Sequence, residues 1–294
     1  MKTKAKILTA AAATIGAVAV SEWAISNNSL AVDRIAIHSG KIPHSFDGFR
    51  IAHISDMHCS SFGQGNERLL HKIKMQYPDI VVITGDMVED ENSDFVSLFN
   101  LIEKLALKYP VYYVVGNHEL RLSEDVYNSM MSQLSLCGAT VLNNNSAAIK
   151  RNDDKIIITG LCNSLCFYAS KEQGGEFTPM TLEEMTEMVG EADTAHFNIL
   201  LVHSPFSFDV YSEWGADLTL SGHVHGGMIR LPKFGGIFSP DFTYFPEYQG
   251  GLYDDGRNYM VVNKGLGSAK IPVRFLNRPE ISVITLKSRQ DTSF

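Results

Sequence analysis

The first half of the chain alternates short apolar runs with longer stretches in which apolar residues recur at helical spacing. The apolar runs occupy residues 49–55, 80–84 and 111–115. Because these runs are continuously apolar, they are typical of strands buried on both faces of a sheet. The stretches at residues 66–76, 93–107 and 123–136 have the pattern of amphipathic helices. This alternation predicts an α/β fold built of layers.

The second half of the chain is richer in predicted strands. We expect them at residues 140–142, 147–150, 155–161, 198–202, 217–220, 260–263 and 281–286, with helices at 181–190 and 206–214. An additional strand is predicted early, at residues 33–38. We find no internal repeat and no change of composition that marks a domain boundary. One domain is therefore predicted at residues 47–294, preceded by a linker and first strand at 27–46.

The N-terminal segment, residues 1–26, has the layout of a signal peptide or signal anchor. Lys2, Lys4 and Lys6 precede an apolar run at residues 7–20. No small-x-small cleavage site directly follows the run, which favours an uncleaved anchor in the cell membrane. The sequence Ser29-Leu30-Ala31 keeps a cleaved, secreted form as the alternative. The lysines place the N-terminus in the cytoplasm, so the main domain is expected outside the membrane.

Composition narrows the functional class. The chain has 294 residues, 45% of them hydrophobic and 20% charged, with a net charge of −8. These proportions are typical of a globular protein, and the absence of a Lys/Arg block in the domain disfavours a nucleic-acid binder. The four cysteines lack zinc-finger spacing. We expect Cys162 and Cys166 to be buried thiols, with a disulfide or half a metal site as the alternatives.

Polar side chains follow five of the predicted strands, at the point where each strand ends. They are Asp56, His58, Asp86, Asn117, His203, His223 and His225. Ligands gather at the carboxyl ends of strands in open α/β sheets, so we expect these side chains to meet. The set is larger than one tetrahedral site needs, and it suits two metal ions that share a carboxylate. Mixed nitrogen and oxygen ligands favour manganese, iron or zinc.

The ordered blocks Asp-x-His, Gly-Asp, Gly-Asn-His-Glu, His and Gly-His-x-His resemble those of the calcineurin-like metallophosphoesterases. The likeness runs from residue 49 to the C-terminus. The block Gly222-His223-Val224-His225-Gly226-Gly227 and the tail at residues 274–281 resemble the bacterial membrane-anchored or exported branch. That branch includes a secreted Bacillus-type phosphoesterase and enzymes resembling UDP-2,3-diacylglucosamine pyrophosphatases. The resemblance implies a four-layer α/β/β/α sandwich of two mixed sheets, here preceded by an N-terminal apolar helix.

The resemblance also implies a role for each matching residue. Asp56, His58 and His225 would hold one metal ion, and Asn117, His203 and His223 the other, with Asp86 bridging both. The catalytic pair would be His118, placed over the leaving group, and Glu119, which would support it. Met228 departs from the branch, which often has Gln after His-Gly-Gly, and this bears on substrate detail rather than on catalysis.

The expected reaction is hydrolysis of a phosphomonoester or phosphodiester by water that two metal ions activate. The alternatives are a lipid or nucleotide-sugar pyrophosphate hydrolase of the same fold, and a binding module without catalysis. The partners expected are a phosphorylated small molecule or lipid, and the membrane through the N-terminal segment. An aromatic segment at residues 234–253 either borders the site or packs on the sheet as an ordinary cap. Arg121 is either a phosphate contact or an exposed helix-start residue.

Overall fold

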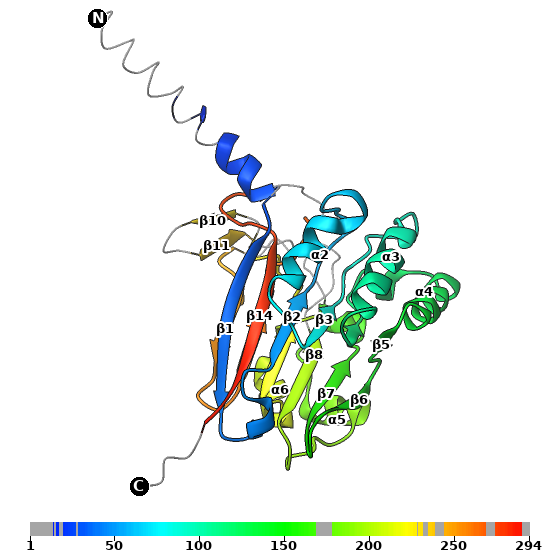
Figure 1. Cartoon of the computed structure of the whole chain (residues 1–294), viewed down its shortest axis with the longest axis vertical. Helices are drawn as coiled ribbons and strands as arrows, with labels where there is room; N and C mark the ends of the chain where they lie inside the picture. The colour runs from blue at the N-terminus through cyan, green and yellow to red at the C-terminus, as the bar shows by residue number, and fades with distance from the viewer. Residues whose placement is uncertain are drawn as a thin grey trace, which may run out of the picture.

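Two six-stranded sheets form the centre of the molecule (Figure 1). The computed structural model describes residues 14, 16–17, 20–27, 29–168, 178–227, 229–231, 235–238, 244–268 and 274–289. Both sheets combine parallel and antiparallel strands, and helices cover their outer faces. The chain is therefore a mixed α/β protein, as the alternating pattern predicts.

The first sheet has the strand order β1-β14-β2-β3-β4-β5. Its strands are β1 (Ala31–Ser39), β2 (Arg50–Ile54), β3 (Ile80–Thr84), β4 (Val111–Val114), β5 (Ala139–Val141) and β14 (Glu280–Ser288). Strands β2, β3, β4 and β5 run parallel, in register Ile51 with Ile80 and Val81 with Val111. Their carboxyl ends consequently open on one edge of the sheet.

The second sheet has the order β12-β13-β9-β8-β7-β6. Its strands are β6 (Asn145–Arg151), β7 (Asp154–Leu161), β8 (Asn198–Val202), β9 (Leu218–Ser221), β12 (Gly251–Asp254) and β13 (Tyr259–Val262). Strands β7, β8, β9 and β13 run parallel. Two short strands, β10 (Ile229–Leu231) and β11 (Gly235–Phe238), form a separate hairpin.

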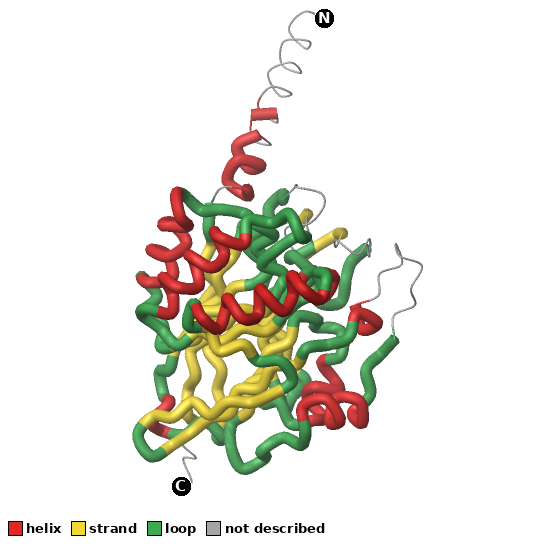
Figure 2. Tube along the Cα trace, turned by 90° about the vertical axis from the view of Figure 1, so that its right-hand side faces the viewer, coloured by secondary structure: helices red, strands yellow, loops and turns green. Residues whose placement is uncertain are grey.

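Three apolar cores separate four layers. One lies between the two sheets and contains Phe46, Ile51, Val82, Ile199 and Leu220. A second packs α2 (Glu67–Lys74), α3 (Phe95–Ala106) and α4 (Glu124–Leu136) on the first sheet, and a third packs α5 (Leu182–Val189) and α6 (Phe208–Trp214) on the second. Figure 2 shows the strands in the middle with helices on opposite sides. Each apolar strand is buried on both faces, which explains its unbroken hydrophobic pattern.

The predicted strands and helices all appear, with boundaries shifted by a few residues at most. The pattern missed β10, β11 and β12, and the 3₁₀ turns η1 (His44–Phe46), η2 (Gln64–Asn66), η3 (Glu119–Arg121) and η4 (Leu165–Tyr168). These elements have three or four residues each, and the three strands are only partly buried, so no continuous apolar run marks them.

Only part of the predicted N-terminal anchor belongs to the described residues. Residues 20–27 are helical and lead directly into β1, whereas most of the apolar run at 7–20 lies outside the described part. Within that part, none of the helices combines the length and the apolar character that crossing a membrane requires.

Candidate metal centre

The ends of strands from both sheets converge on one point. Asp56 follows β2, Asp86 follows β3, Asn117 follows β4, His203 follows β8, and His223 and His225 follow β9. Five of the predicted ligands have left-handed backbone conformations, with φ of 51° at Asp56, 43° at His58, 52° at Asp86, 74° at His223 and 49° at His225. In residues other than glycine, each such conformation costs about 1–3 kcal/mol and persists only where the surrounding structure holds it. These conformations cluster at functional sites.

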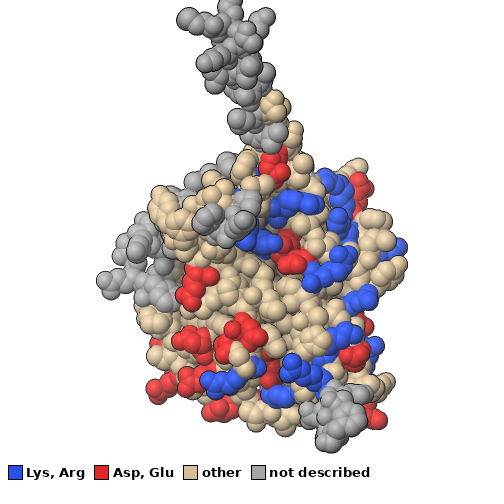
Figure 3. Space-filling model, turned by 90° about the vertical axis from the view of Figure 1, so that its left-hand side faces the viewer, with Lys and Arg blue, Asp and Glu red and all other residues tan. Residues whose placement is uncertain are grey.

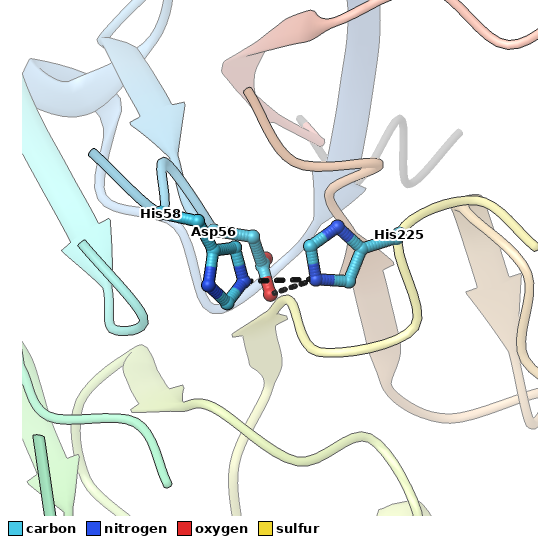
Figure 4. A group of neighbouring side chains, drawn as sticks. All are labelled: Asp56, His58 and His225. Atoms are coloured by element: carbon cyan, nitrogen blue, oxygen red, sulfur yellow. Dashed lines mark hydrogen bonds and ion pairs between the residues drawn. The ribbon is translucent and has the colours of Figure 1, made fainter. Parts of the chain in front are cut away.

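One ligand group consists of Asp56, His58 and His225. The Nε2 atoms of His58 and His225 lie 3.1 Å apart, and Nε2 of His225 lies 3.4 Å from Oδ1 of Asp56 (Figure 4). Nδ1 of His58 donates a 2.6 Å hydrogen bond to Oε2 of Glu89. Its Nε2 therefore carries a lone pair that faces the other two side chains, as a metal ligand requires.

The second group consists of Asp86, His203 and His223. Nδ1 of His203 donates to the carbonyl oxygen of Thr84 at 2.5 Å, so Nε2 is the nitrogen that can bind a metal ion once it has lost its proton. That Nε2 atom lies 3.0 Å from Oδ2 of Asp86. The rings of His203 and His223 meet edge to face, with centroids 5.1 Å apart.

Asp86 lies between the two groups. Its Oδ2 atom is 3.0 Å from Nε2 of His203 and 3.9 Å from Nε2 of His58. It is also 4.0 Å from Nε2 of His118, which with His58 and Asp86 forms a third cluster of potential ligands. One carboxylate thus reaches both sets of imidazoles, the placement expected of a bridging ligand.

Burial of the two aspartates creates a demand for positive charge. Burial raises the pKa of Asp56, while His203 holds the pKa of Asp86 well below its usual range despite burial. Burial opposes the charged form of His203, yet the carboxylates of Asp86 and Asp56 raise its pKa to about 10. Burial, reinforced by His58, lowers the pKa of His225 well below its usual range. A divalent cation among these atoms would supply the charge that a proton on His203 otherwise provides.

The donor set fits metal ions. Oδ1 of Asn117 is buried and has no hydrogen-bond partner among the described residues. Buried polar atoms are nearly always satisfied, so this orphaned amide oxygen is available to an ion. Together with the lone pairs of His58 and His203, it gives both groups oxygen and nitrogen donors. The structure therefore provides a candidate dinuclear metal centre.

Two glycines let the strand ends approach so closely. A Cβ atom on Gly222 would lie 2.1 Å from Oγ of Ser55 and 2.3 Å from Oδ2 of Asp56. A Cβ atom on Gly116 would lie 2.3 Å from Oδ1 of Asp86. The backbone amide of His223, next to Gly222, donates to Oδ1 of Asp56 at 3.0 Å. Glycine at these positions is therefore required by the close contact between the loops, across the two sheets at Gly222 and within the first sheet at Gly116.

His118 lies beside the ligands and is oriented by Glu89. Its Nδ1 atom donates to the carbonyl oxygen of Glu89 at 2.8 Å, so its Nε2 atom carries the lone pair. The side chain of the same Glu89 holds His58, whose hydrogen bond lowers the pKa of the Glu89 carboxyl. The sequence analysis did not identify Glu89, because nothing in the sequence distinguishes it from the neighbouring Asp90 and Glu91.

The predicted support of His118 by Glu119 is wrong. Glu119 is fully buried and accepts four hydrogen bonds, from the backbone amides of Asp86, Met87 and Gly116 and from the hydroxyl of Tyr113, all at 2.8 Å. These four donors saturate both carboxylate oxygens. Glu119 therefore holds the turn that carries Asp86, while the backbone of Glu89 orients His118.

A family model described as "Calcineurin-like phosphoesterase" matches residues 49–227, which span every ligand in both groups. The chain is a member of this family. It is 33% identical over 257 residues to "Uncharacterized metallophosphoesterase YkuE" of Bacillus subtilis (strain 168), covering 86% of this chain and 84% of that protein. As the family and its named relatives imply, it is a hydrolase acting on phosphoric esters.

Two further relatives have informative names. "Phosphodiesterase YaeI" of Escherichia coli (strain K12) is 26% identical over 242 residues, covering 81% of this chain and 82% of that protein. "Transmembrane protein with metallophosphoesterase domain" of Danio rerio is 27% identical over 256 residues, covering 84% of this chain and 55% of that protein.

Aromatic rings flank the second ligand group of this phosphoesterase. The ring of Tyr168 lies 5.5 Å from that of His223, and Phe206 meets His223 edge to face at 5.4 Å. The sequence analysis missed both residues, because nothing local to them indicates proximity to His223. Tyr248 and Tyr253 pack against a small core that includes Val224, so this part of the aromatic segment behaves as a cap on the second sheet.

The sequence analysis also singled out Arg121, Met228 and two cysteines. Arg121 is exposed in η3, and none of its interactions described here involves a ligand. Cys162 is a free, half-buried thiol, whereas the side chain of Cys166 lies outside the described part. Met228, the predicted departure from the branch, also lies outside it.

Proposed function

We propose that this phosphoesterase hydrolyses a phosphomonoester or phosphodiester with two divalent metal ions, manganese, iron or zinc. The observation that carries the proposal is the position of the Asp86 carboxylate between two imidazole groups. Asp56, His58 and His225 would hold one ion, Asn117, His203 and His223 the other, and Asp86 both. Such ions lower the pKa of a bound water and polarise a phosphoryl oxygen.

The residues of this chain then position the substrate and move a proton. His118 is fixed through Nδ1 on the carbonyl oxygen of Glu89, so Nε2 faces the ligand groups. In its protonated form that nitrogen donates its proton to the leaving oxygen as the phosphorus–oxygen bond breaks. His118 is only 15% exposed, which limits the access of bulk water to this proton.

A panel of substrates tests the reaction and separates it from its alternatives. The purified chain, supplied with manganese, is assayed with p-nitrophenyl phosphate, its bis-ester, and lipid and nucleotide-sugar pyrophosphates. We expect hydrolysis of a monoester or diester, in line with the name of the phosphodiesterase relative. Turnover of pyrophosphates alone would favour the alternative pyrophosphate hydrolase. No turnover of any substrate, together with no effect of His118→Ala, would favour a binding module.

We propose in addition that the enzyme is held at the cell membrane by its N-terminal segment, with the domain outside. The three lysines and the apolar run of residues 7–20 support this location. The name of the transmembrane relative from Danio rerio agrees with it. The substrate would then be a phosphorylated small molecule or lipid on the outer side. Full-length protein in the soluble cytosolic fraction would refute the membrane location, and a cleaved form in the medium would establish the secreted alternative.

A further inference from the structure

Exposed hydrophobic side chains gather around the base of the N-terminal helix. The described part of the chain has fifteen large hydrophobic residues with exposed side chains, and eight belong to four segments, at residues 20–25, 229–231, 244–245 and 276. These eight are Val20, Trp23, Ile25, Ile229, Leu231, Tyr244, Phe245 and Leu276. We call them the hairpin face, because the β10–β11 hairpin lies among them. Large exposed apolar patches generally mark a binding surface.

Hydrogen bonds join the segments of the hairpin face. The amide of Arg230 donates to the carbonyl oxygen of Phe275, and the amide of Phe245 donates to that of Ile237 in β11. The side chain of Asn27 donates to the carbonyl oxygen of Arg274, which ties the helix to the same tail. Figure 1 shows the hairpin beside the base of this helix, which points away from the domain. An apolar cleft of about 780 Å³ lies between helix and tail, lined by Ile25, Phe275 and Leu276 among others.

A cationic pocket adjoins this cleft. It has a volume of about 290 Å³ and is lined by Glu22, Ala31, Arg230, Lys264, Leu276, Asn277, Arg278 and Glu280. Lys264 forms an ion pair with Glu280, whereas the hydrogen bonds described for Arg230 and Arg278 all go to neutral oxygens. Glu22 is the only other acidic residue in the lining. The two arginines therefore give the lining a net positive charge. In Figure 3, Lys and Arg side chains gather on the upper part of the face, below the helix.

We propose that the hairpin face is a docking surface for an anionic phospholipid bilayer, with a lipid phosphate in the cationic pocket and acyl chains against the apolar cleft. An apolar rim beside arginines matches the boundary between headgroups and acyl chains, where Trp and Tyr are also enriched. The sequence supplies the reason for a bilayer rather than a protein partner. In the sequence, the helix that borders the face is preceded by the apolar run that follows Lys2, Lys4 and Lys6.

Docking in this orientation brings the metal centre's own loop to the membrane. Arg230 donates through Nη1 to the carbonyl oxygen of Gly226, and Asn277 donates to that of His225. Two residues that line the cationic pocket thus contact the backbone of the loop that carries the ligand His225. The proposal concerns how the domain sits on the bilayer, so it stands independently of the substrate proposed above.

Fluorescence quenching tests the docking. The full-length chain is reconstituted in vesicles whose acyl chains carry bromine, a short-range quencher of tryptophan. Phe245→Trp adds a probe on the hairpin face, and Leu136→Trp adds one at an exposed position of α4, away from it in Figure 1. We expect added quenching for Phe245→Trp but not for Leu136→Trp, and more of it when phosphatidylglycerol is mixed into phosphatidylcholine. Equal quenching of the two probes would overturn the proposal.

A matched pair of charge reversals tests the pocket. Arg278→Glu should weaken the phosphatidylglycerol-dependent part of the quenching about tenfold, because each basic residue near an anionic surface contributes substantially to binding. Lys108→Glu makes the same change of net charge at an exposed position beyond α3 and should leave the quenching unchanged. Equal loss in both variants would refute a specific pocket. If emission of Phe245→Trp changes with protein concentration at fixed lipid, the face binds a second copy and the bilayer proposal fails.

Discussion

The backbone amide of Asp86 donates a 2.8 Å hydrogen bond to Oε2 of Glu119, a residue that binds no metal in the proposed scheme. Asp86 has a left-handed backbone, with φ of 52°, and its carboxylate faces both imidazole groups. The turn that aims this carboxylate is strained, and four hydrogen bonds to the buried Glu119 hold it in place. The geometry of the metal centre therefore depends on Glu119, a residue outside both ligand groups.

Replacement of Glu119 should weaken the metal centre without removing a ligand. In Glu119→Gln, the amide group must face at least one backbone donor, which costs about 2–4 kcal/mol of unfolding free energy. Metal affinity should fall roughly 10- to 100-fold, the usual cost of losing an outer-shell partner. Urea denaturation and metal titration measure the two effects. Tyr113→Phe, which removes one of the four donors, is the control and should cost only about 1 kcal/mol. Unchanged metal affinity in Glu119→Gln would contradict this role.

His118 should matter for turnover and not for metal content. Its Nε2 atom faces the ligand groups but is 4.0 Å from Asp86, and its proposed task is proton donation. His118→Asn should lower kcat by about 10²–10⁴ while two metal ions per chain remain bound. Elemental analysis of the variant, beside its kinetics on a phosphoester, provides the check. Loss of metal in step with loss of activity would mean that His118 is a ligand.

Glu89 should matter for metal binding and not for turnover at saturating metal. Its side chain holds Nδ1 of His58, but only its backbone carbonyl holds His118. Glu89→Gln therefore removes the charged partner of a ligand and leaves the bond to His118 in place. We expect roughly 10- to 100-fold weaker binding of one metal ion, with kcat recovered when metal is in excess. A kcat that stays low at saturating metal would refute this division of roles.

The two histidines that follow β9 should act on different metal ions. His225 belongs with Asp56 and His58, whereas His223 belongs with Asp86 and His203. In titrations followed by calorimetry, His225→Ala should lose one binding event and His223→Ala the other, each leaving the remaining event largely intact. If both variants lost the same event, the assignment of the two groups would be wrong.

Sequence analysis predicted most of the fold because the buried parallel strands are marked by unbroken apolar runs. It also predicted where the ligands meet, since Asp56, Asp86 and His203 each follow such a run directly. What it could not predict are contacts of side chains that no pattern in the sequence marks. The adjacency of Glu119 to His118 suggested a partnership, but Glu119 instead accepts from two amides of the loop after β3, and from Tyr113 and Gly116. Glu89 and Tyr168 were missed for the same reason.

Gly222 should not tolerate even an alanine. The added Cβ atom would overlap Oγ of Ser55 and Oδ2 of Asp56, so either the loop or the ligand must move. Gly222→Ala should therefore abolish binding of the metal ion held by Asp56. Overpacking should also lower the free energy of unfolding by about 1–3 kcal/mol or more. Gly40→Ala is the control, because no atom lies within 4 Å of its added Cβ. Normal metal binding by Gly222→Ala would show that the loop can shift freely.

His53 gives the fold a dependence on pH that is separate from the metal ligands. Burial lowers the pKa of His53 to about 3, and its Nε2 atom lies 2.8 Å from Oγ1 of Thr84. In the unfolded chain a histidine has its ordinary pKa near 6.5. Below that pH the unfolded state binds one more proton than the folded state, so the contribution of a neutral, buried His53 is lost as pH falls from about 6.5 towards 3. Above about pH 6.5 it is fully present.

The expected slope is about 1.4 kcal/mol of unfolding free energy per pH unit within that window. Other buried groups titrate there too, so the measurement is the difference between the parent chain and His53→Gln, which cannot titrate. Urea denaturation at pH 7.5, 6 and 5 should show the stability advantage of the parent shrinking by about 2 kcal/mol between pH 7.5 and 5. A difference that does not change with pH would mean that His53 keeps its ordinary pKa in the folded protein.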